Sequence, residues 1–185
     1  PSPPAPNVTV YPLHSRTSFV TKNVYHTPDR ERRTSTVDSV IEPYRTEEVP
    51  DIDAAIWHLA GPGSGRHSQR DDPLCRPAAP WWPSTCKPCL RWVENGGMVY
   101  HDWAEKKELL PYVRFLKTDA AEAEILTGLT DRAEAARQLY QWGAKEILIT
   151  HNTEVLVYDG REIYTCPIRA RNLSGRTGRG DTTFA

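Results

Sequence analysis

The second half of the chain alternates strand-like and helix-like segments, and this alternation limits its possible folds more than any other feature. Strand-like segments, rich in β-branched and aromatic residues, lie at 98–102, 112–118 and 145–150. Helix-like patterns lie at 104–110, 119–126 and 130–143. Parallel strands joined through helices form right-handed crossovers, which place the helices against the sheet. We therefore predict an α/β fold with a three-layer, mainly parallel sheet and flanking helices.

Local signals mark the ends of these helices. The acidic start of the 119–126 helix suits the positive end of the helix dipole, and Gly128 is predicted to end it. Thr130 is the expected N-cap of the following helix, and Gly143 its terminator. After the 145–150 strand, Asp159 and Gly160 predict a β-hairpin turn.

The N-terminal part has a different pattern. Alternating β-branched and aromatic residues between Asn7 and Asp38 predict two or three antiparallel strands, with a turn near 27–30. The segment Asp53–Leu59 is predicted to be one buried strand, because it is short, apolar and followed by Gly61 and Pro62.

Residues 61–89 interrupt both patterns. Most of the 16 prolines lie in this segment and in the first dozen residues, and proline interrupts helices and central strands. The segment also lacks a helical or strand period, so we expect it to be irregular. Such a long connection inside a compact domain is either disordered or foreign to the fold, as a shifted reading frame would make it.

Composition excludes several classes of function. A formal charge of -1 provides no positive field for a nucleic-acid backbone, and no apolar run approaches the roughly 20 residues that span a bilayer. The N-terminus lacks the pattern of a secretory signal, and four cysteines are too few for a disulfide scaffold. We therefore expect a cytoplasmic protein that binds neither nucleic acid nor membrane.

The last loop of the chain carries the clearest chemical signal. Gly175, Gly178 and Gly180 allow the backbone N–H groups to turn toward a ligand, and the following residues can begin a helix. This arrangement predicts an anion site. Asp181 would oppose a bound phosphate if it were only structural, whereas it suits a base that takes a proton from an attacking hydroxyl.

This loop resembles the signature D-T-x-G-A-G-D of the PfkB, or ribokinase-like, carbohydrate kinases. The resemblance implies that Asp181 is the catalytic base and that Gly178, Arg179 and Gly180 form the anion hole. The family also implies a reaction, the ATP-dependent phosphorylation of a sugar or a related hydroxyl compound. ATP and Mg²⁺ would be the cofactors, a sugar or nucleoside the substrate, and a homodimer through the lid the implied assembly.

Two further segments agree with the family in order and spacing. The segment 117–128 resembles its N-x-x-E motif, with Asp119 in the Asn position and Glu122 as the Glu that organises Mg²⁺ and phosphate through water. Thr150 ends the strand that lies near the nucleotide phosphates in the family. The resemblance implies that residues 1–50 are lid-like β strands and that 51–185 form a partial ribokinase-like α/β domain, irregular at 61–89.

The chain also departs from the family pattern. Gly175 and Arg176 replace the start of the signature, and residues 151–153 replace the usual glycines of the nucleotide loop. The chain ends at Ala185, soon after the signature, so the resemblance implies a truncated or disrupted member. A non-catalytic fragment or regulatory binding module is the alternative, and an exported adhesion protein displaying Arg179-Gly180-Asp181 is the third. Taken alone, the loop could be a surface turn, and Asp119 and Glu122 a solvated helix start.

Overall fold

The protein was examined as a computed structural model, which describes residues 7–26, 33–42, 48, 50–56, 58, 82–85, 87–169 and 183. Its strands are β1 (Val20–Tyr25), β2 (Arg33–Ser39), β3 (Trp82–Thr85), β4 (Arg91–Glu94), β5 (Gly97–Tyr100), β6 (Val113–Asp119), β7 (Glu146–Thr150), β8 (Glu154–Tyr158) and β9 (Ile163–Pro167). Its helices are α1 (Lys87–Leu90), α2 (Lys106–Leu109), the 3-10 turn η3 (Leu110–Tyr112), α3 (Ala120–Thr127) and α4 (Arg132–Gln141). The strands form two sheets, and the α/β class is confirmed.

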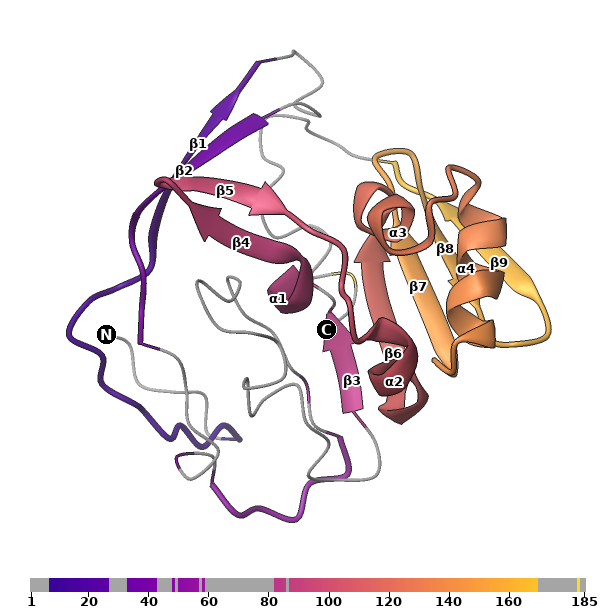
Figure 1. The fold of residues 1–185 in the computed structure, drawn as a ribbon. Coiled ribbons are helices and arrows are strands. Elements are labelled where there is room, and N and C mark those ends of the chain that lie inside the picture. The colour runs from indigo at the N-terminus through magenta and orange to yellow at the C-terminus, as the bar shows by residue number, and fades with distance from the viewer. Residues whose placement is uncertain are drawn as a thin grey trace.

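The larger sheet has five strands in the order β3-β6-β7-β8-β9. Strands β3, β6 and β7 are parallel, and the hairpin β8–β9 extends the sheet with antiparallel pairs. The predicted interior strand and the predicted hairpin are therefore present. Figure 1 shows α3 and α4 against this sheet, with the smaller sheet on the side of β3 and β6.

The core lies between this sheet and its helices. Leu116 in β6 and Ile147 and Ile149 in β7 have no exposed surface, and neither have Ala136 and Leu139 in α4. Each large apolar side chain buried in this way stabilises the fold by about 1.5–3 kcal/mol. The positions of β6 and β7 are therefore fixed by packing, and so are the ends of these two strands.

The ends of α3 and α4 agree with the sequence predictions except at the N-cap of α4. Gly128 ends α3 in the left-handed conformation with φ 74°, as predicted. The N-cap of α4 is Asp131 and not Thr130, because the Asp131 carboxylate accepts a hydrogen bond of 2.9 Å from the backbone N–H of Glu134. A carboxylate at this position also interacts favourably with the helix dipole.

The smaller sheet has the strand order β1-β2-β5-β4. The predicted antiparallel pairing of the N-terminal strands is confirmed in β1 and β2. Strand β5 was expected to belong to the α/β sheet, but it pairs with β2 at Thr36 and Gly97 and forms a hairpin with β4. Asn95 and Gly96 both have positive φ, which is the two-residue turn that favours a hairpin.

Two sequence expectations in the middle of the chain are wrong. The described residues 50–56 and 58 form no strand, and Ile56 is 62 % exposed instead of buried. Residues 82–85, expected to be irregular, form β3 at the edge of the larger sheet, where a proline without an N–H can be tolerated. Residues 87–90 form α1, and 61–81 lie outside the described residues.

Membrane association was also considered from the helices. Within the described ranges, no helix combines the length and apolar character needed to cross a bilayer.

Candidate functional site

The carboxyl ends of β6 and β7 bring two predicted site residues together. Asp119 is the last residue of β6 and Thr150 the last of β7, and the two are paired in register. Thr150 is 7 % exposed, and its hydroxyl donates a hydrogen bond of 3.3 Å to the carbonyl oxygen of Thr118. Ligands of α/β sheets bind outside the carboxyl ends of the strands, so this edge is the candidate functional site.

Glu122, the third predicted residue, is fixed next to Asp119 by a reciprocal pair of hydrogen bonds. Asp119 Oδ1 accepts from the backbone N–H of Glu122, and Glu122 Oε2 accepts from the backbone N–H of Asp119, each over 2.8 Å. Such a capping box satisfies two N–H groups at the start of α3. Glu122 is only 1 % exposed, so the interpretation of these residues as a solvated helix start is wrong for this carboxylate.

Two cations that the sequence did not single out lie near Glu122. Arg91 Nη2, at the start of β4, lies 3.9 Å from Glu122 Oε1. Lys117 in β6 is 1 % exposed, and its positive charge acts on the same carboxyl. One feature of the sequence pointed to Lys117. Alternate residues of a strand lie on the same face, so residue 117 shares a face with the predicted site residue Asp119.

The surroundings of Glu122 shift the pKa of its carboxyl in both directions. Burial raises the pKa of its carboxyl, and the neighbouring Asp119 carboxylate raises it further. The charge of Lys117, the hydrogen bond from Asp119 and the charge of Arg91 lower it, in that order of size. Burial dominates, so the pKa of Glu122 lies above its ordinary value of 4.5. Perturbed carboxyl groups of this kind occur often at functional sites.

The fit of the site to Mg²⁺ follows from the same contacts. Asp119 and Glu122 each use one carboxylate oxygen in the capping box, and Glu122 Oε1 lies 3.9 Å from Arg91 Nη2. Among the residues that the structure describes, no group of three His, Cys, Asp or Glu side chains could hold a metal ion. Carboxylates are nevertheless ligands that Mg²⁺ takes while keeping several of its waters, so the chemistry of Asp119 and Glu122 is compatible with such an ion.

The loop after Thr150 is short and filled by side chains. The backbone N–H of His151 donates to the carbonyl of Glu154 over 2.9 Å, and the ring Nδ1 lies 2.9 Å from the hydroxyl of Thr153. The hydrogen bond from Ile168 N–H to the Thr153 carbonyl, 2.7 Å, ties this loop to the end of β9. Where the family has glycines, this chain has a compact turn bearing an imidazole.

The remaining predicted residues, Gly178, Arg179, Gly180 and Asp181, lie outside the described residues, and their roles stay predictions. Strand β9 runs antiparallel to β8, which runs antiparallel to β7, and Pro167 pairs with Glu154. The carboxyl end of β9 therefore lies at the same edge of the sheet as Thr150.

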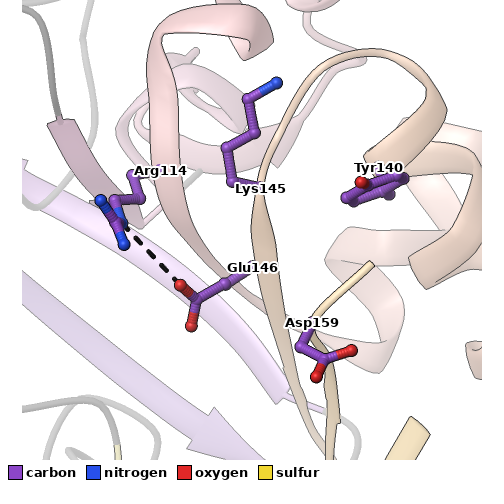
Figure 2. Close-up of a pocket in the computed structure, with 5 residues that line it drawn as sticks. All are labelled: Arg114, Tyr140, Lys145, Glu146 and Asp159. Carbon is purple, nitrogen blue, oxygen red and sulfur yellow. Dashed lines mark ion pairs between the residues drawn. The ribbon is translucent and has the colours of Figure 1, made fainter. Parts of the chain in front are cut away.

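A shallow pocket of about 300 Å³ lies elsewhere, at the opposite end of β7. Figure 2 shows its lining residues Arg114, Tyr140, Lys145, Glu146 and Asp159. Glu146 is the first residue of β7, so this pocket is separated from Thr150 by the length of the strand. It contains no residue predicted to be functional.

Comparisons with known proteins were made with the whole chain. No family model matches. A cytidine kinase from Thermococcus kodakarensis is 40 % identical over 78 residues, which are 40 % of this chain and 28 % of that protein.

Solved structures resemble much more of the chain. The sulfate complex of a pyrophosphate-dependent kinase in the ribokinase family is 33 % identical, with a TM-score of 0.80, over 92 % of this chain and 60 % of that one. The complex of a pyrophosphate-dependent kinase of that family with a pyrophosphate analog and myo-inositol is 32 % identical, with a TM-score of 0.79, over 93 % and 60 %. The chain thus spans about 60 % of the length of these structures.

Proposed function

We propose that this chain is a ribokinase-like protein of the PfkB type and that it takes part in phosphoryl transfer to a hydroxyl group of a small sugar-like molecule. The observation that carries the proposal is the meeting of Asp119, Glu122 and Thr150 at one edge of the sheet. Asp119 and Glu122 are neighbours through the capping box, whereas Thr150 is distant in the sequence and is brought next to Asp119 by the parallel pairing of β6 and β7.

The proposed mechanism assigns the chemical step to the glycine loop. Asp181 takes the proton of the acceptor hydroxyl, whose oxygen then bonds to the terminal phosphorus of the donor, and the bond from that phosphorus to the bridging oxygen breaks. The N–H groups of residues 178–180 stabilise the charge on the transferring group. Mg²⁺, when bound through water by Asp119 and Glu122, would neutralise charge on the phosphate oxygens.

The donor is either ATP, as the family resemblance implies, or pyrophosphate. Pyrophosphate is favoured by two observations. The two solved relatives with TM-scores of 0.80 and 0.79 are described as pyrophosphate-dependent. In addition, the compact turn His151–Thr153 replaces the glycines with which the family opens its nucleotide loop.

The acceptor is proposed to be a cyclic polyol or a nucleoside. One relative was solved with myo-inositol, and another is a cytidine kinase, so both classes of hydroxyl compound are candidates. We also retain from the sequence a homodimer through the lid-like strands of residues 1–50 as a proposed assembly.

Phosphorus NMR of reaction mixtures tests the proposal. The chain is mixed with Mg²⁺, one donor (ATP or pyrophosphate) and one acceptor (myo-inositol, cytidine or ribose). We expect a phosphate monoester in at least one mixture, its loss in Asp181→Asn, and its retention in Asp159→Asn, a matched change in the β8–β9 turn. Product formation by Asp181→Asn at the wild-type rate would refute the role of Asp181 as the base.

A second candidate is a binding module without turnover. It is favoured by the replacement of the glycines of the family's nucleotide loop by residues 151–153. Under this proposal the chain binds donor or acceptor, detected as a ligand-dependent rise in melting temperature, and forms no monoester in any mixture.

A further inference from the structure

Arg91 lies at the junction between the two sheets. The two residues before it, Cys89 and Leu90, are buried in the core of the larger sheet at 5 % and 0 % exposure. Arg91 itself begins β4 and pairs in register with Tyr100 of β5 in the smaller sheet. Its guanidinium is therefore held where the smaller sheet leaves the core, beside Glu122 of the candidate site.

The guanidinium makes few contacts for a group so deeply placed. Its side chain is 14 % exposed, and its Nη2 lies 3.9 Å from Glu122 Oε1, the one ion pair of Arg91 within the described part of the chain. That separation exceeds the roughly 2.7–2.9 Å of a charge-assisted hydrogen bond. The guanidinium carbon also lies 5.7 Å from the centre of the Tyr100 ring, a cation–π contact that uses no N–H group.

One donor of Arg91 is buried and unused. Its Nε has no hydrogen-bond partner among the residues that the structure describes. Burying an N–H donor without a partner costs free energy, and an arginine carries five donors in a rigid fork. A fork of this kind matches two oxygens of a phosphate group. The unused Nε donor thus indicates an anionic ligand.

We propose that Arg91 binds oxygens of the phosphoryl donor, at the junction between the smaller sheet and the carboxyl edge of the larger one. This inference rests on the proposed function, because it assumes that a phosphate enters this edge. The buried Lys117 adds a second positive charge nearby.

Calorimetric titration of the chain with sodium pyrophosphate, and separately with inorganic phosphate, tests the inference. Pyrophosphate binding to Arg91→Gln should be weaker than binding to the wild type by about tenfold or more. Arg91→Lys keeps the charge and loses the fork, so we expect an intermediate affinity. Arg114→Gln is the matched control, because Arg114 Nε lies 3.8 Å from Glu146 Oε1 in a half-exposed ion pair at the far end of β7 (Figure 2).

A measurement without variants guards against misfolding of Arg91→Gln. The wild-type chain is treated with an arginine-specific dicarbonyl reagent, with and without pyrophosphate, and modified peptides are quantified by mass spectrometry. We expect pyrophosphate to protect Arg91 and to leave Arg114 as reactive as before. Equal protection of the two arginines, equal affinity of Arg91→Gln and wild type, or no binding by the wild type at about 10 mM pyrophosphate overturns the inference.

The two proposals fail in different ways. A chain that binds pyrophosphate through Arg91 and forms no monoester contradicts the proposed turnover and leaves the anion site intact. A chain that forms monoester, and whose pyrophosphate affinity is unchanged in Arg91→Gln, contradicts the anion site alone.

Discussion

Asp119 and Glu122 each accept a hydrogen bond from the backbone N–H of the other, and both bonds are 2.8 Å long. The contacts that start α3 therefore also hold two carboxylates at the carboxyl end of β6. A structural role and a role in the candidate site are compatible here. One residue can cap the helix with one oxygen and face a hydrated cation with the other.

Asp119 allows these two roles to be separated. Asp119→Ala removes the N-cap and should lower the free energy of unfolding by about 0.5–2 kcal/mol, whereas Asp119→Asn keeps a good cap and should lower it little. We expect Asp119→Asn nevertheless to weaken the dependence of donor binding on Mg²⁺, because it removes a charge. Urea unfolding and calorimetric titration measure the two effects.

The matched control for this prediction is the other helix. Asp131 caps α4, because its carboxylate accepts a 2.9 Å hydrogen bond from the Glu134 N–H, and it is not one of the predicted site residues. Asp131→Ala should cost about as much stability as Asp119→Ala and leave donor binding unchanged. A loss of donor binding in Asp131→Ala would mean that the effect at Asp119 reflects stability alone.

Glu122 should make stability depend on pH. Its folded-state pKa is raised above 4.5 by burial, so between 4.5 and the folded-state value the folded protein holds a proton that the unfolded chain has released. The free energy of unfolding therefore falls as pH rises through this window. In Glu122→Gln this fall is absent, so the stability of the variant relative to wild type should improve as pH increases above 4.5.

Urea unfolding at several pH values between about 4.5 and 8 checks this dependence. Glu124→Gln, an exposed change on the same helix, serves as the control and should follow the wild-type curve. If Glu122→Gln and Glu124→Gln shift the curve identically, burial of Glu122 does not govern its protonation.

The sequence predicted best where the signal and its effect are local. The start of α3 at Asp119 and its end at Gly128 depend on residues within one turn of the helix, so both were predicted. The sheet to which β5 belongs was not predicted, because its pairing joins Gly97 to Thr36, far away in the chain. The turn at Asn95 was nevertheless a local hairpin signal that the interpretation missed.

In the candidate site too, local features could be predicted from the sequence and features that depend on tertiary packing could not. Glu122 was predicted from a motif, but its burial was not, since burial depends on the whole fold. Arg91 was missed altogether, because it follows a segment expected to be irregular and reaches Glu122 only through tertiary packing. The pairing of Asp119 with Thr150 could be expected once both strands were taken as parallel neighbours.

Gly143 should be intolerant of a side chain. Its φ is 120°, and a Cβ built on it would lie 2.7 Å from Pro111 Cα, a backbone atom that cannot easily move. Gly128 also has a positive φ, 74°, but a Cβ there meets open space. We expect Gly128→Ala to cost about 1–2 kcal/mol of stability and Gly143→Ala about 1–3 kcal/mol more, as measured by urea unfolding. Equal costs would show that the turn after α4 can move away from η3.

Lys117 should be coupled to Glu122 in stability. Lys117→Met removes a buried positive charge that lowers the Glu122 pKa, so the carboxyl becomes harder to ionise in the folded protein. The cost of Lys117→Met should therefore grow as pH rises, because more of the unfolded chain is then deprotonated at residue 122.

In the double variant Lys117→Met/Glu122→Gln no carboxylate remains to be compensated, and much of the cost should be recovered. A double-mutant cycle at pH 7 should give a coupling free energy of about 0.5–3 kcal/mol. Lys106→Met is a control lysine, because its ammonium donates to Asp102 Oδ1 over 2.7 Å and to the Leu126 carbonyl over 2.6 Å, at the other end of α3. Its effect should add to that of Glu122→Gln without coupling, since the two groups lie at opposite ends of α3. Additive costs for Lys117→Met and Glu122→Gln would instead mean that the buried lysine does not stabilise the carboxylate, and that the positive charge at this edge serves the ligand alone.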